Sequence, residues 1–233
     1  MTRILEAKRK GAAPGQADAA VVLLHGYGAN ADDLLGLADL LAPHMPGTAF
    51  VAPDAPELCI GNPMGYQWFP IPWIDGSPQE AAERGMADAV GDLQRFLDAL
   101  LAEEGLPAER VILFGFSQGT MMALHVAARR AAPFAGVVGF SGRLLLPELL
   151  QDEATSRPPV LLVHGDSDPV VPPASLPEAA EALQQAGFDV YAHIMKGTEH
   201  GIAPDGLSVA LAFMRDRLGF EQSADAAEAP DRG

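Results

Sequence analysis

A serine between two glycines, in the stretch Gly115–Gly119, constrains the fold of this chain more than any other feature. An apolar run, Val111–Phe114, precedes it, and a helix-forming run, Thr120–Leu124, follows it. This order predicts a strand, a sharp turn and a helix, with Ser117 in a strained conformation that lifts its hydroxyl above the sheet edge. The glycines keep Cβ atoms out of the space where strand and helix approach each other. Ser117 is therefore a candidate nucleophile, and the helix that begins here offers free N–H groups to an oxyanion.

A nucleophilic serine of this kind is followed along the chain by an acid and then by a histidine. The apolar segment Val160–Val163 runs into a loop rich in Asp and Pro, so its carboxylates are expected at the carboxyl edge of a sheet, where ligands bind. Two acids compete for the role. Asp166, close to the strand, is expected to organise the turn by accepting backbone N–H groups. Asp168 reaches further and is followed by Pro169, which fixes the backbone, so we favour Asp168.

The histidine is expected in a loop after a later strand. Phe188–Met195 is typical of that strand, and His200 lies in the glycine-containing loop that follows it. His193 lies inside the strand and is interpreted as a structural or surface residue. His125, within the helix after Ser117, is interpreted as a core or groove residue with satisfied hydrogen bonds.

The second oxyanion donor is expected in the loop after an early strand. Ala19–Leu24 is typical of a buried strand, and the glycines within His25–Asn30 predict a loop there. A backbone N–H from this loop can join the N–H of Gln118 at the substrate carbonyl. His25 itself is interpreted as a packing and hydrogen-bonding residue under the loop.

These segments together resemble the phospholipase/carboxylesterase family of α/β-hydrolases, which includes small bacterial carboxylesterases and acyl-protein thioesterases. The resemblance spans about residues 18 to 218. It implies the α/β-hydrolase fold, with oxyanion donors that map to the N–H groups of Tyr27 and Gln118. The family usually has an aliphatic residue where this chain has Tyr27. It also commonly has an acidic residue after the catalytic histidine, whereas here Glu199 precedes His200 and Gly201 follows.

Two loops are expected to shape the substrate pocket. Residues 57–79 hold both tryptophans, and their glycines and prolines predict no regular element. In the resembling family this aromatic stretch lies beside the serine, so Trp68 and Phe69 are predicted pocket residues. Leu144 and Leu145, in the loop after another strand, are predicted to line an apolar acyl site.

The remaining sequence alternates strands and helices, as a mostly parallel central sheet with helices on both faces requires. Residues 1–218 are predicted to form a single domain, with no segment for a large lid. Residues 219–233 are predicted to be a disordered acidic tail. The expected elements are strands at 48–52 and 134–140 and helices at 80–101, 117–130, 174–186 and 204–218.

The amino-acid composition disfavours some classes of binding partner and substrate. The 233 residues carry 15 basic and 31 acidic side chains, a formal net charge of −16. This charge argues against nucleic acids and anionic membrane surfaces, and it favours a neutral or zwitterionic small-molecule ester. No apolar run has the length of a membrane span or of a signal peptide. Cys59 is the only cysteine, which excludes an intrachain disulfide. A cytoplasmic protein is expected. The sequence does not determine the oligomeric state, for which a homodimer is one alternative.

The sequence thus predicts a serine carboxylesterase that hydrolyses short- to medium-chain esters through an acyl-enzyme. Ser117, Asp168 and His200 are its predicted triad. No metal or organic cofactor is expected, because the chain has no cysteine cluster and no pair of histidines four residues apart. A lysophospholipase or an acyl-protein thioesterase is the alternative. A non-catalytic binding protein on the same fold is disfavoured, because all three triad residues are present.

Overall fold

The computed structural model describes residues 3–220, so the predicted acidic tail lies outside the described residues except for its first two positions. A seven-stranded sheet has the order β1-β3-β2-β6-β7-β8-β9. The edge strand β1 pairs antiparallel with β3, and every other pair is parallel, which confirms the predicted sheet. The strands are β1 Ala7–Gly11, β2 Ala19–Leu24, β3 Thr48–Pro53, β6 Val111–Phe116, β7 Gly136–Phe140, β8 Val160–Gly165 and β9 Val190–Met195.

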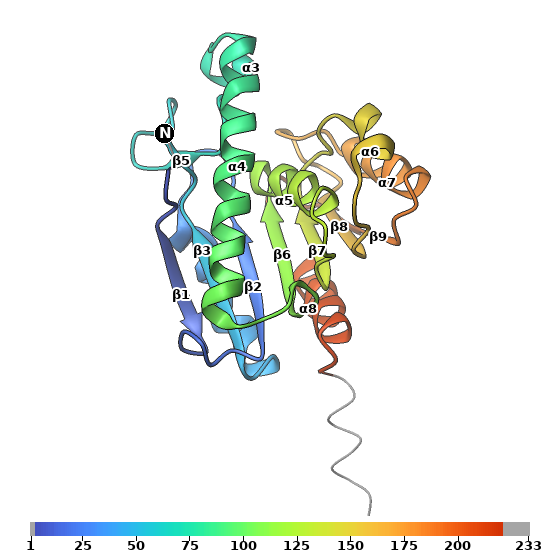
Figure 1. The fold of residues 1–233 in the computed structure, drawn as a ribbon. Helices are drawn as coiled ribbons and strands as arrows, with labels where there is room; N and C mark the ends of the chain where they lie inside the picture. Colours follow the sequence, from blue (N-terminus) through green and yellow to red (C-terminus); the bar gives the residue numbers. More distant parts are fainter. Residues whose placement is uncertain (1–2, 221–233) are drawn as a thin grey trace, which may run out of the picture.

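Helices cover both faces of the sheet, as predicted (Figure 1). One face is packed by α4 (Gln79–Glu104), α5 (Gln118–Ala128), α6 (Pro147–Glu153) and α7 (Ser175–Gln185). The other is packed by α1 (Ala31–Leu35), α2 (Ala38–Leu41) and α8 (Pro204–Arg217). Within β2, Val22 and Leu24 belong to the first core and Val21 and Leu23 to the second. A strand buried on both faces needs a continuous apolar run of this kind. Short 3₁₀ turns follow α2 and precede β6, at Ala42–His44 and Ala108–Arg110.

The prediction that residues 57–79 hold no regular element is wrong. They contain the antiparallel pair β4 (Glu57–Leu58) and β5 (Tyr66–Gln67) and the one-turn helix α3 (Pro72–Asp75). Two-residue strands are too short for a periodic signal, and here they are fixed by tertiary contact, since Tyr66 pairs with Ala29 in the loop after β2. A proline at the first helical position is compatible with a helix, because its missing N–H is not needed there.

The direction in which the chain adds strands to the sheet reverses between β2 and β6. The chain leaves β2 toward β3 on one side, whereas β6 to β9 extend the sheet on the other. Ligands of open α/β sheets bind at such a reversal, outside the carboxyl ends of the strands. Tyr27 follows β2 and Ser117 follows β6, so both lie at this reversal, while Asp168 and His200 follow β8 and β9 at the same edge. No helix within residues 3–220 is both long enough and apolar enough to cross a membrane.

Candidate active site

Ser117 occupies the turn between β6 and α5 with φ 53° and ψ −116°. A positive φ is strained for a residue with a Cβ, and such strain concentrates at functional sites. Glycine is required on both sides of Ser117 because neighbouring backbone lies too close to leave room for a Cβ. A Cβ on Gly115 would lie 2.5 Å from the backbone of Thr120, and one on Gly119 would lie 1.9 Å from the Leu24 carbonyl oxygen. The sequence prediction of a strained strand-to-helix turn is confirmed.

Asp168 and His200 meet at the carboxyl edge. The Nδ1–H of His200 donates to Oδ2 of Asp168 at 2.7 Å, and the His200 ring packs on Phe116, the neighbour of Ser117, with centroids 4.9 Å apart. Oδ1 of Asp168 accepts the N–H groups of Val170 and Val171 at 2.8 and 2.9 Å. An imidazole held through Nδ1 by a carboxylate leaves Nε2 free to accept a proton.

These hydrogen bonds keep Asp168 ionised although it is only 5% exposed. Burial by itself would raise the pKa of the carboxyl, but the bonds from His200 and from two backbone N–H groups outweigh it, so the pKa lies below its ordinary value. Asp166 is exposed and accepts the N–H of Gly197 at 2.7 Å, which ties the loop after β8 to the loop after β9. Asp166 therefore organises the turn, in agreement with the sequence interpretation.

The loop after β2 lies against the nucleophile. A Cβ on Gly26 would be 3.2 Å from the Cβ of Ser117. Within residues 3–220, neither the Tyr27 N–H nor the Gln118 N–H donates to a protein acceptor, so both are free to bind an oxygen of substrate. The Tyr27 phenol donates to Asp75 at 3.0 Å, and burial together with hydrogen bonds to Cys59 and Asp75 raises its pKa.

His25 is a support residue, as the sequence suggested. It is completely buried, its Nδ1–H donates to the Gly26 carbonyl at 2.8 Å, and its Nε2 accepts the Ala55 N–H at 2.9 Å. Burial lowers its pKa, so the ring is neutral with both nitrogens used. The indole N–H of Trp68 donates to the His25 carbonyl at 2.9 Å. His193, interpreted from the sequence as a structural or surface residue, is partly exposed and pairs with Asp205.

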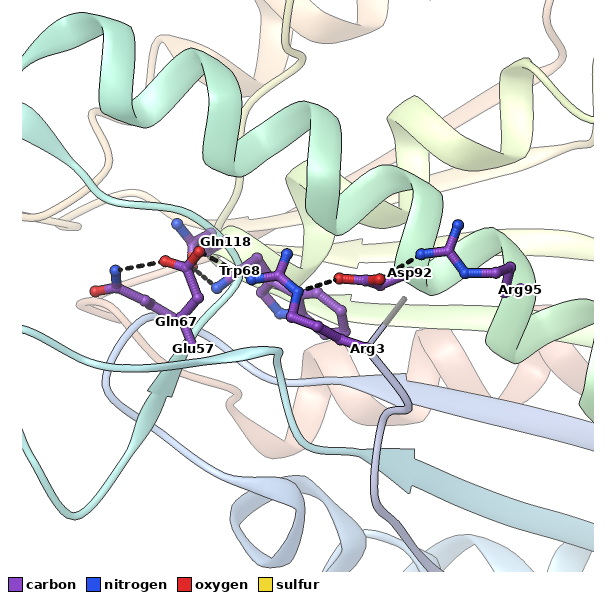
Figure 2. A network of polar contacts seen from close by, with 7 residues as sticks. All are labelled: Arg3, Glu57, Gln67, Trp68, Asp92, Arg95 and Gln118. Carbon is purple, nitrogen blue, oxygen red and sulfur yellow. Dashed lines mark hydrogen bonds and ion pairs between the residues drawn. The ribbon is translucent and has the colours of Figure 1, made fainter. Parts of the chain in front are cut away.

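The side chain of Gln118 has a structural task that the sequence did not reveal. It is completely buried, its Oε1 accepts the Trp68 N–H at 2.9 Å, and its Nε2 donates to the Phe69 carbonyl at 2.8 Å. Figure 2 shows it among polar side chains that join α4, the β4–β5 pair and the chain start. In this network Arg3 donates to Asp92 and Glu57, Arg95 donates to Asp92, and Gln67 donates to Glu57. Through its two hydrogen bonds to Trp68 and Phe69, Gln118 links the candidate oxyanion hole to the aromatic loop at residues 57–79.

Two cavities lie beside the loop at residues 57–79 and the loop after β7. The smaller, about 320 Å³, is lined by Phe69, Leu144 and Leu145, three of the predicted pocket residues. Trp68 lines neither cavity and is completely buried, so the prediction that it forms the pocket wall is wrong. Trp68 packs inward because both its N–H groups find acceptors there, and the exposed Trp73 lines both cavities instead.

The larger cavity, about 800 Å³, lies between α4, α5 and α6 and includes His125. The interpretation of His125 as hydrogen-bonded is wrong for one nitrogen, since its Nδ1 is buried without a partner among residues 3–220. The loop residue Leu146 lines both cavities in a left-handed conformation with φ 49°, and Ser141 after β7 has φ 47°. With Ser117 these are the non-glycine positive φ values in the described chain, and all follow strands β6 and β7. No local sequence signal marks the other two.

Within residues 3–220, no three His, Cys, Asp or Glu side chains are grouped closely enough to hold a metal ion. The groups described above that form the candidate site are a serine, a histidine–carboxylate pair and backbone N–H groups.

Comparisons with known proteins agree with this arrangement. The family model described as phospholipase/carboxylesterase matches residues 11–218. Acyl-protein thioesterase 1 of Gibberella zeae is 30% identical over 88% of this chain and 93% of its own length. Esterase YpfH of Escherichia coli is 30% identical over 84% of this chain and 81% of its own. The crystal structure of esterase PE8 superimposes with a TM-score of 0.87 at 43% identity, covering 92% of this chain and 100% of that one.

Proposed function

Because the chain belongs to the phospholipase/carboxylesterase family of α/β-hydrolases, we propose that it is a serine hydrolase that cleaves short- to medium-chain carboxylic esters. The observation that carries this proposal is a strained Ser117 whose neighbour Phe116 packs on His200, a histidine whose Nδ1–H is bound to a buried carboxylate. This is the constellation that acyl transfer through a serine requires.

In the proposed reaction Ser117 Oγ attacks the ester carbonyl while His200 Nε2 takes its proton. The tetrahedral intermediate collapses as His200 returns that proton to the leaving alcohol, which leaves an acyl group on Ser117. Water then attacks the acyl-enzyme with His200 again as the base, and Ser117 is released with the carboxylic acid. Asp168 keeps the imidazole in the productive tautomer and stabilises the imidazolium that forms.

The oxyanion of both intermediates would be bound by the N–H groups of Tyr27 and Gln118. Their lack of an internal acceptor supports this role, because preorganised donors need no rearrangement when charge develops. Gln118 is also the first residue of α5, so the partial positive charge of the helix N-terminus adds to its N–H.

Hydrolysis of thioesters is the second candidate, favoured by the similarity to acyl-protein thioesterase 1 of Gibberella zeae. The two reactions share every catalytic group and differ in the leaving atom. A thiolate leaves more readily than an alkoxide because its conjugate acid has the lower pKa, so proton return from His200 matters less for thioesters. Lysophospholipids are a third substrate class, which the same chemistry would cleave.

Labelling with a fluorophosphonate, followed by a substrate panel, tests the proposal. Wild-type protein should incorporate the probe at Ser117, and Ser117→Ala should not. A panel of p-nitrophenyl esters, acyl thioesters and lysophospholipids then ranks the classes by kcat/KM, with Ser141→Ala as the control serine variant. Labelling that persists in Ser117→Ala, or a wild-type protein that neither labels nor hydrolyses any of these substrates, would refute the proposal and favour a binding protein.

A further inference from the structure

Tyr27, in the loop after β2, is hydrogen-bonded through its side chain. Its phenol O–H donates to Oδ2 of Asp75 in α3 at 3.0 Å, and the Cys59 thiol is a weaker partner of the same oxygen. Within residues 3–220, neither the N–H nor the carbonyl of Tyr27 is hydrogen-bonded. The neighbours differ, because the Gly26 carbonyl accepts an imidazole N–H at 2.8 Å and the Gly28 N–H donates to a carbonyl of β5 at 2.8 Å. Between these two tied neighbours, the phenol is the group that bonds Tyr27 to another element.

The acceptor of this bond, Asp75, is itself firmly held. Its Oδ2 also accepts the Ile71 N–H at 2.8 Å, and its Oδ1 accepts the Ser77 N–H at 2.8 Å. Burial by itself would raise the pKa of the carboxyl, but hydrogen bonds from Ser77, Ile71 and Tyr27 outweigh it, so the pKa lies below its ordinary value. Hydrogen bonds to a charged acceptor are stronger than neutral ones. The phenol is therefore bonded to a carboxylate that backbone groups on both sides of α3 hold in place.

The segment from Trp68 to Asp75 bonds to both residues whose N–H groups are the candidate oxyanion donors. At one end, Trp68 and Phe69 hold the Gln118 side chain at 2.9 and 2.8 Å. At the other end, Asp75 holds the Tyr27 phenol. An oxyanion hole needs its donors aimed at one oxygen, about 2.7–3.1 Å away. Because this segment is tied to the side chains of both donor residues, it can keep their N–H groups aligned.

We propose that Asp75 is a positioning residue of the oxyanion hole, which keeps the Tyr27 N–H aligned with the Gln118 N–H by accepting the Tyr27 phenol. This role rests on the proposed serine hydrolase activity and deepens it. Asp75 acts through Tyr27 and not on the substrate.

The test compares wild type with Tyr27→Phe, Asp75→Ala and the double variant on p-nitrophenyl butyrate. Tyr27→Phe removes the hydroxyl and keeps the ring and the N–H. Tyr191→Phe is the matched control, because it removes a phenol–carboxylate bond of 2.9 Å to Asp189 on the exposed side of β9. Rates are referred to active sites titrated to completion with a fluorophosphonate, so a loss of folded enzyme cancels. The affinity for n-butylboronic acid is a second measurement, since its tetrahedral adduct with a serine places an oxygen where the oxyanion develops.

In Tyr27→Phe, kcat should fall about tenfold, less than the hundredfold or more that follows the loss of a donor. KM should stay within about twofold, because acylation and deacylation both pass through an oxyanion and slow together. The affinity for n-butylboronic acid should fall by about the same factor as kcat. The double variant should be no slower than Asp75→Ala, since one bond joins the two side chains. Tyr191→Phe should change none of these quantities.

A kcat for Tyr27→Phe within about twofold of wild type would overturn the inference. A lower kcat with unchanged boronic acid affinity, or losses that multiply in the double variant, would also overturn it and leave the bond a structural role in α3. Failure of the proposed hydrolase activity has a different signature. A wild-type protein that neither cleaves butyrate nor takes the fluorophosphonate at Ser117 would overturn that activity and this role together.

Discussion

The side chain of Gln118 offers the sharpest test of how the site is held together. Gln118→Met keeps the length and volume of the side chain but removes both hydrogen bonds. The N–H of Trp68 and the carbonyl of Phe69 would be left unpaired, and Trp68 is completely buried. Each unpaired buried group costs about 1–3 kcal/mol, so the variant should lose about 2–6 kcal/mol of unfolding free energy. This is a large part of the 5–15 kcal/mol that a domain typically has.

Urea unfolding at 25 °C, followed by circular dichroism, measures this loss. The Gln118 N–H survives in Gln118→Met, so kcat at low denaturant should fall far less than in a triad variant. Gln185→Met, on the exposed surface of α7, is the control and should stay within about 0.5 kcal/mol of wild type. A loss below about 1 kcal/mol for Gln118→Met with an unchanged m-value would refute the view that these two bonds fasten the aromatic loop.

Three further predictions concern the acid, the oxyanion hole and the cavity. Asp168→Asn should lower kcat for p-nitrophenyl butyrate by about 10⁴-fold while Asp166→Asn lowers it less than tenfold, and the reverse order would reassign the acid. Tyr27→Pro, which deletes an N–H, should lose about 3 kcal/mol of transition-state stabilisation relative to Tyr27→Leu, and equal rates in two folded variants would place the donor elsewhere. Burial, followed by the charge of Arg129, lowers the pKa of His125 to about 4, below its unfolded value near 6.5. The unfolded chain therefore binds the extra proton between these values, so urea-derived stability should fall by up to about 1.4 kcal/mol per unit as pH drops from 6.5 to 4, and His125→Leu should flatten that slope.

The residues with the clearest local signals were found from sequence. Ser117 was predicted because two glycines, a preceding strand and a following helix are all properties of neighbouring residues. Asp168 and His200 were predicted because loops after parallel strands share one edge of the sheet. The structure adds the 2.7 Å hydrogen bond between them and shows Asp166 tied to Gly197, which spacing alone left open.

Other features depended on contacts between distant segments. Trp68 was predicted as a pocket residue because the aromatic stretch of the resembling family lies beside the serine, yet acceptors contributed by His25 and Gln118, far away in the chain, hold it in the interior. The pair β4–β5 exists through Tyr66 and the loop after β2, with too few residues for a periodic signal. The two cavities that Leu145 and Leu146 line are formed by helices and loops that meet only in the folded chain. Sequence determined the order of the reacting groups, because strand, turn and helix preferences are local. Burial and cavity shape were decided by the tertiary structure, because they depend on which distant side chains fill the remaining space.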